Sequence, residues 1–121
     1  MDDRRFFQRI PFQTVSKVTV QGKTVQGTLM DISMKGALVA LPEDSLPSLG
    51  ETASLDMYLP SSEITLRFAA EVVHLSGNEA GLFFRQVDVD TLTHLRRLLE
   101  LNSGDEGRVS EELAYWLKPK A

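Results

Sequence analysis

Apolar and polar residues alternate along much of the first 87 positions, which is the period of half-buried β-strands. The alternation is clearest over residues 51–59 and 64–75. Residues 36–41 form a short, continuous apolar run instead, and such a run is typical of a strand that is covered on both faces. This part of the chain is therefore predicted to be mostly β-structure.

Turn-forming residues divide this region into short segments. Gly22, Pro42 and the pair Gly77-Asn78 each follow or separate apolar runs, as expected of tight connections between strands. The predicted strands cover residues 14–20, 23–32, 36–41, 51–59, 64–75 and 81–87. Six strands joined by short polar turns predict a closed or nearly closed antiparallel barrel.

From residue 88 onward the period changes to that of an α-helix. Leu92, Leu95 and Leu99 fall on one helical stripe, and Asp88 or Asp90 is placed to cap the first turn. A second helix is predicted after it, with an apolar stripe formed by Val109, Leu113 and Trp116. We expect a mostly β fold that ends in C-terminal helices.

The pattern divides the chain into three parts of one domain. Residues 1–12 form a flexible arginine-rich arm, residues 13–87 form the barrel, and residues 88–121 form the C-terminal helical segment. Pro11 disfavours a helix at the residue before it, so the arm is expected to enter the barrel in an extended form. The three positive charges of the arm repel one another, which favours a loosely held segment.

Composition limits the classes of function. A length of 121 residues suits a single domain, and the absence of cysteine excludes disulfides and thiolate metal sites and fits the cytoplasm. A net charge of −4 argues against a general nucleic-acid binder. No apolar run approaches the roughly 18 residues of a membrane span. Two scattered histidines and no paired carboxylates at helical spacing give no support to an enzyme or a metal site, and no cofactor is expected.

Two polar clusters stand out from this background. The turn after the second predicted strand carries Asp31, Ser33 and Gly36, which offer a carboxylate, a hydroxyl and a glycine within one bend. The arm carries three guanidinium groups, those of Arg4, Arg5 and Arg9. Together they suit a ligand with anionic oxygens and a base edge that both donates and accepts. The turn residues also commonly form Asx-type turns between strands, and the two uses are compatible.

The order of these clusters resembles the PilZ domain family, whose members are bacterial receptors for cyclic di-GMP. The pattern Arg5-x-x-x-Arg9 is followed about twenty residues later by Asp31-x-Ser33-x-x-Gly36 and an apolar strand. Each motif alone is common, but their order, spacing and position beside a predicted six-stranded barrel are specific. The resemblance covers nearly the whole chain and extends to the predicted helix that contains residues 94–102.

The resemblance implies a role for each cluster. Arg5 and Arg9 would contact phosphate and guanine, because an arginine fork matches the N7 and O6 acceptors of guanine. Asp31, Ser33 and Gly36 would form the half of the site on the barrel, with the carboxylate accepting from guanine N–H groups. The residue before the first motif, Arg4, favours binding of an intercalated pair of nucleotides. His74 is placed on a strand that flanks the nucleotide and would stack on a guanine.

The resemblance also implies an adaptor mechanism. Binding of cyclic di-GMP would order the arm and change a surface that a protein partner recognises, with motility, chemotaxis or biofilm control as the expected pathway and a flagellar or chemotaxis component as the expected partner. The alternative is a PilZ-like interaction barrel that binds a protein and no nucleotide. The two readings differ in whether the arginine and aspartate motifs are used.

Overall fold

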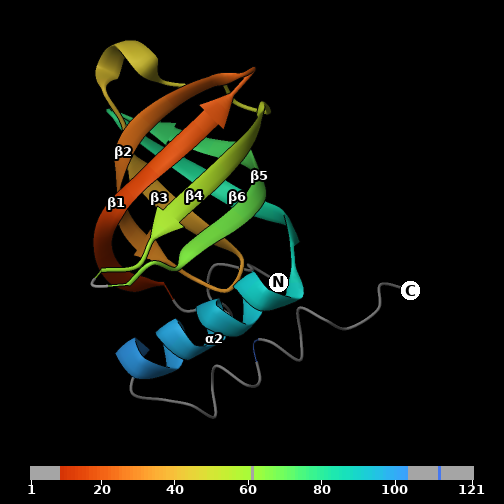
Figure 1. Ribbon diagram of the computed structural model, residues 1–121. Helices are drawn as coiled ribbons and strands as arrows, with labels where there is room; N and C mark the ends of the chain where they lie inside the picture. Colours follow the sequence, from red (N-terminus) through yellow and green to blue (C-terminus); the bar gives the residue numbers. More distant parts are fainter. Residues whose placement is uncertain (1–8, 61, 104–111, 113–121) are drawn as a thin grey trace.

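Six antiparallel strands close into a barrel in the computed structural model, which describes residues 9–60, 62–103 and 112 (Figure 1). The neighbours around the barrel run in the order β1-β2-β3-β6-β5-β4, with β1 closing against β4. The strands are β1 (Ile10–Val20), β2 (Lys23–Ile32), β3 (Gly36–Ala40), β4 (Thr52–Tyr58), β5 (Thr65–Ser76) and β6 (Glu79–Val87). The predicted mostly β fold and closed barrel are confirmed.

The first strand begins earlier than the alternation of its sequence indicates. β1 starts at Ile10, which is buried and pairs with Ile32, although residues 10–12 were assigned to the arm. Pro11 is tolerated there because β4 pairs only with Ser16–Thr19, so the start of β1 has a strand on one side alone. A register shift between Pro11 and Thr14 interrupts the alternation, and for this reason the sequence pattern did not reveal the start of the strand.

The barrel interior is filled by apolar side chains from all six strands. At its centre the rings of Phe68 and Phe84 stack with their centroids 4.0 Å apart. Around them lie fully buried side chains that include Leu29, Val39, Leu55, Met57 and Leu66. Tight packing leaves the outer face of the wall as the place where polar chemistry can occur.

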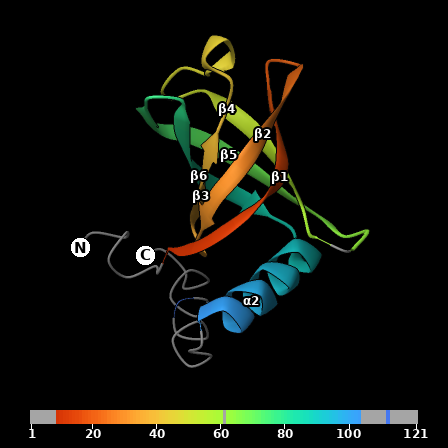
Figure 2. The same ribbon diagram turned by 90° about the vertical axis from the view of Figure 1, so that its left-hand side faces the viewer.

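One end of the barrel is covered by helix α2 (Val89–Ser103), while the short helix η1 (Glu43–Ser45) lies at the other end (Figures 1 and 2). Leu95, Leu98 and Leu99 are the buried face of α2. Asp88 caps α2, since its Oδ1 accepts a hydrogen bond of 2.7 Å from the amide of Thr91. The predicted first helix and one of its two candidate caps are therefore confirmed.

The second predicted helix lies outside the described residues except for Glu112. This residue is helical and its side chain is only 3% exposed. Within the described part of the chain, no helix is both long and apolar enough to cross a membrane.

Three register shifts bend the wall formed by β2, β3, β6 and β5. One shift lies between Leu29 and Asp31 in β2, and a second lies between Val72 and His74 in β5. The third is in β6, where Arg85 has no paired residue on β5 because its neighbours Phe84 and Gln86 pair with the adjacent residues Ala70 and Ala69. Each shift inserts a residue that breaks the strict alternation and turns neighbouring side chains outward. These positions recur in the functional site.

Ser16 and Thr14 of β1 differ in burial and in whether the side-chain hydroxyl has a hydrogen-bond partner. Ser16 is fully buried and its Oγ has no hydrogen-bond partner among the described residues, whereas Thr14 Oγ1 donates to the Tyr58 carbonyl. We expect Ser16→Ala to leave the free energy of unfolding unchanged or to raise it by up to about 1 kcal/mol, because a desolvated, unpaired hydroxyl is removed. Urea denaturation measures the change.

The matched variant is Thr14→Val, which keeps the side-chain shape and removes a hydroxyl that does have a partner. It should lower the free energy of unfolding by about 1 kcal/mol. If Ser16→Ala lowers the free energy of unfolding by a similar amount, the Ser16 hydroxyl has a hydrogen-bond partner in solution, which would contradict the prediction.

Candidate functional site

The turn between β2 and β3 is closed by the hydroxyl of Ser33. Its Oγ accepts hydrogen bonds from the amides of Lys35 and Gly36, each 3.2 Å long, and the Ser33 amide donates to the Gly36 carbonyl at 2.8 Å. The Lys35 carbonyl then accepts from the amide of Phe84, which ties the turn to β6. Ser33 thus belongs to both the turn and the candidate site. Because the serine hydroxyl accepts the hydrogen bonds of the turn amides, the Asp31 carboxylate is not needed to close the turn.

Gly36 is required by a close approach between two strands. It pairs with Phe83 of β6, and a Cβ added to it would overlap the carbonyl oxygen of Leu82. A glycine is favoured either by a positive φ or by a close approach of the backbone. Gly36 is not among the residues with positive φ, so the close approach is the reason that applies here. The glycine of the motif therefore holds β3 against β6.

This close approach predicts the effect of a methyl group. Gly36→Ala should lower the free energy of unfolding by about 1–3 kcal/mol, because the backbone of β6 must move to admit the new atom. Gly22→Ala is the control, since a Cβ at Gly22 meets nothing within 4 Å and only its φ of +78° opposes the change. Thermal unfolding compares the two variants; equal or smaller loss at Gly36 would contradict the close approach.

Arg9 and Asp31 form a two-pronged ion pair at the edge of β2. Arg9 Nη2 donates to Asp31 Oδ2 at 2.7 Å, and Nε donates to Oδ1 at 3.3 Å. The Arg9 side chain is 50% exposed and the Asp31 side chain 19% exposed. Arg9 and Asp31 are 22 positions apart in the sequence. They meet because Pro11 of β1 pairs with Asp31 of β2.

The charge of Arg9 is reinforced by its surroundings. Hydrogen bonding to Asp31 raises the pKa of Arg9 and outweighs the opposing effect of burial, and the negative charges of Asp31 and Glu79 raise it further. Arg9 therefore stays cationic at any pH at which the fold persists. An anionic ligand would find a permanent positive charge at this edge of the wall.

Asp31 and His74 lie at the two ends of one row across the outer wall. The row runs through paired residues of four neighbouring strands, Asp31, Leu38, Gly81 and His74. Three strand spacings separate its ends, or about 14 Å. The register shifts beside Asp31 and His74 turn both side chains out of the alternation, so a bulge positions each end of the row.

One of the two residues in the middle of this row, Gly81, has no side chain. A Cβ at Gly81 would lie 3.0 Å from the Cβ of His74. Leu38 is only partly buried, and Gly36 lies in the neighbouring row of β3. We call this part of the outer wall the platform; Arg9 and Asp31 lie at one end of it and the exposed His74 at the other.

The structure brings together four of the seven residues that the sequence indicated: Arg9, Asp31, Ser33 and Gly36. His74 lies on the same wall, about 14 Å from Asp31 at the other end of the row. Arg4 and Arg5 lie outside the described residues, so their contacts stay a prediction. The sequence reasoning missed Leu38, Gly81 and the outward residues of β6. The period of two in β6 could have shown that Gly81 and Phe83 share a face, but not that β6 neighbours β3.

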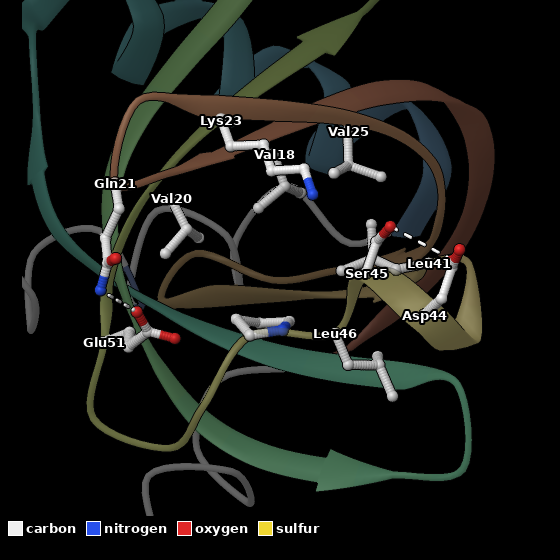
Figure 3. Close-up of a pocket in the computed structure, with 11 residues that line it drawn as sticks. Val18, Val20, Gln21, Lys23, Val25, Leu41, Asp44, Ser45, Leu46 and Glu51 are labelled. Carbon is white, nitrogen blue, oxygen red and sulfur yellow. Dashed lines mark hydrogen bonds between the residues drawn. The ribbon is translucent and has the colours of Figure 1, made fainter.

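A separate cavity of about 340 Å³ lies at the barrel end near η1 (Figure 3). Across its rim Gln21 donates to the carboxylate of Glu51 at 2.8 Å. Lys23, which lines this cavity, is eight positions from Asp31 along β2, a distance of about 26 Å. The cavity is not part of the Arg9–Asp31 site. Among the described residues, no group of three or more His, Asp or Glu side chains is arranged to hold a metal ion.

The fold and the site together define a small six-stranded barrel with a charged platform on its outer wall. Comparison with known families identifies the class: the PilZ domain model matches residues 3–101, which include both motifs and most of α2. The chain therefore belongs to the PilZ domain family.

Solved structures of low sequence identity share the fold. The PilZ domain of YcgR from Escherichia coli, determined with c-di-GMP, is 16% identical, with a TM-score of 0.67 over 84% of this chain and 92% of that one. The longer YcgR complex is 17% identical, with a TM-score of 0.69 over 95% of this chain and 51% of that one. The Bacillus subtilis inhibitor of motility MotI is 19% identical, with a TM-score of 0.66 over 80% of this chain and 52% of that one. The chain thus spans about half the length of these two longer relatives.

Proposed function

We propose that this protein is a receptor for cyclic di-GMP, and that the platform beside the Arg9–Asp31 pair is its binding face. The observation that carries the proposal is the ion pair itself, which places a forked donor and a carboxylate acceptor at the same edge of the row. An arginine fork matches the N7 and O6 acceptors of guanine, and a carboxylate accepts from its N–H donors. Membership of the PilZ family and the c-di-GMP bound to the YcgR domain support the same ligand.

The ion pair is suited to exchange its partners for a ligand. A pair this exposed contributes roughly 0–1 kcal/mol to stability, so opening or sharing it costs little. A carboxylate offers about four acceptor positions and Arg9 occupies two of them, which leaves acceptor capacity for a guanine edge. In this proposal Arg9 moves from Asp31 toward phosphate or guanine, while Asp31 keeps its position on β2.

The length of the platform supports a large ligand. A row of about 14 Å between Asp31 and His74 has room for more than one purine, and the exposed imidazole of His74 is available for stacking at the far end. Binding as an intercalated pair, with Arg4 and Arg5 completing the site, is part of the proposal. Ser33 and Gly36 act mainly by holding the turn that positions Asp31.

The output in this proposal is a changed surface, without catalysis. Ordering of the residues before Arg9 would alter what a protein partner meets, as in segments that fold on binding. A cytoplasmic adaptor in motility, chemotaxis or biofilm control, with a flagellar or chemotaxis component as its partner, fits such a device. The competing proposal is an interaction barrel that ignores nucleotide.

The test is a calorimetric titration with cyclic di-GMP at moderate salt. The wild type should bind saturably, and Arg9→Ala should weaken binding by about tenfold or more, because charge-assisted hydrogen bonds to the ligand are lost. Its stoichiometry distinguishes one nucleotide from a pair. The matched control is Arg67→Ala, which removes an exposed arginine of β5 that faces Asp56 of the neighbouring β4.

Arg67→Ala should bind like the wild type. Absence of binding in a folded wild type would contradict the receptor proposal and favour the nucleotide-free interaction barrel. Equal weakening in both variants would show that net charge, and not the Arg9–Asp31 site, governs affinity.

A further inference from the structure

A carboxylate without a hydrogen-bond partner lies on the outer wall beside the platform. Glu79 is the first residue of β6 and is half-buried, yet its side chain makes no hydrogen bond or ion pair among the residues that the structure describes. The residues Ala80 and Leu82 of the same strand are buried in the barrel, so Glu79 and Gly81 face outward together. An unpaired carboxylate keeps all of its acceptor positions for a ligand.

Glu79 lies one step along β6 from the row of the platform. Gly81 belongs to this row, and Glu79 is two residues before it on the same face of the strand, about 7 Å away. The residues that pair with Glu79 on either side are Ala40 of β3 and Ser76 of β5, and both are small. Because Gly81 has no side chain, nothing from β6 stands between the Glu79 carboxylate and the middle of the platform.

The charge of Glu79 acts across the platform. It is one of the charges that raise the pKa of Arg9, although Arg9 meets Asp31 on the far side of β3. Two strand spacings and one step of about 7 Å separate the positions of Asp31 and Glu79, or about 12 Å in total. The two carboxylates therefore belong to one platform but occupy different positions on it.

An unpaired carboxylate beside a site for an anionic ligand is unfavourable unless it meets hydrogen-bond donors. The phosphates of cyclic di-GMP offer acceptors alone, whereas each guanine offers neighbouring N1–H and N2–H donors on its Watson–Crick edge. Adenine has an acceptor at N1 instead, so a carboxylate at that edge favours guanine. One edge carries these donors side by side, and carboxylates at positions about 12 Å apart therefore suit two different guanines.

We propose that Glu79 accepts hydrogen bonds from the N1–H and N2–H groups of a second guanine, and that this contact makes the platform selective for guanine at both bases of cyclic di-GMP. The inference rests on the proposed function, because the ligand is the one assigned there. Asp31 reads the first guanine beside Arg9, and Glu79 reads the other. The neutral surroundings of Glu79 on its own face leave its carboxylate free for this contact.

The experiment compares cyclic di-GMP with the hybrid cyclic dinucleotide that contains one guanine and one adenine. Calorimetry gives both dissociation constants for the wild type, for Glu79→Gln and for the control Glu43→Gln. The control removes the same charge from an exposed residue of η1, outside the platform. The quantity compared is the ratio of the two dissociation constants, because a general effect of charge or a misfolded fraction of the protein changes both titrations alike.

In the wild type the hybrid should bind about tenfold more weakly than cyclic di-GMP, because adenine has no N1–H to donate to Glu79. Glu79→Gln should reduce this ratio severalfold, since an amide offers a single acceptor oxygen and no charge. Glu43→Gln should keep the wild-type ratio.

The outcomes separate the two proposals. No binding of cyclic di-GMP by the folded wild type would overturn the proposed function itself. If the wild type binds and Arg9→Ala weakens binding, equal affinity of the wild type for both nucleotides, or an unchanged ratio in Glu79→Gln, would overturn the second guanine contact alone. Tighter binding of both nucleotides by the same factor in Glu79→Gln would show that Glu79 only repels an anion. An equal fall of the ratio in Glu43→Gln would also overturn the contact, because the effect would not belong to the platform.

Discussion

The close approach of β3 and β6 at Gly36 is the constraint on which the wall of this barrel depends. A side chain there would overlap the Leu82 carbonyl, so β3 and β6 would have to move apart to admit it. The hydrogen bonds of Ser33 and of the Lys35 carbonyl then fix the turn that enters β3. The motif Asp31-x-Ser33-x-x-Gly36, which resembles a ligand-binding signature, thus also holds β3 against β6.

The contact between β3 and β6 explains how polar groups on the outer wall take defined positions without being buried. Once β3 is fixed between β2 and β6, the register places Asp31 at one end of a row and His74 at the other. Bulges turn both residues outward, and Gly81 in the middle of the row has no side chain. Arg9 reaches this edge because β1 begins at Ile10 and pairs with the end of β2. The fold therefore provides a rigid acceptor side with a permanent cation beside it.

Much of this arrangement could be predicted from local sequence signals. The period of two located the six strands, and the two motifs indicated Arg9 and Asp31, because residue type and order carry that information. The start of β1 was missed because a register shift breaks its alternation. The proximity of Gly81 and the outward residues of β6 to the site was missed for a different reason: it depends on β6 lying beside β3, a contact between strands that are distant in sequence. Periodicity shows which residues share a face of a strand, but not which strands are neighbours.

The most direct test of the account is an amide chemical-shift map of the ¹⁵N-labelled protein during titration with cyclic di-GMP. The account predicts saturable shifts at Asp31, Leu38, Gly81 and His74, which lie on four strands but in one row. It also predicts little change at Val20 and Lys23, which line the cavity at the far end of the barrel. Shifts centred on that cavity, or no shifts at saturating nucleotide, would contradict the claim that the outer wall beside the Arg9–Asp31 pair is the binding face.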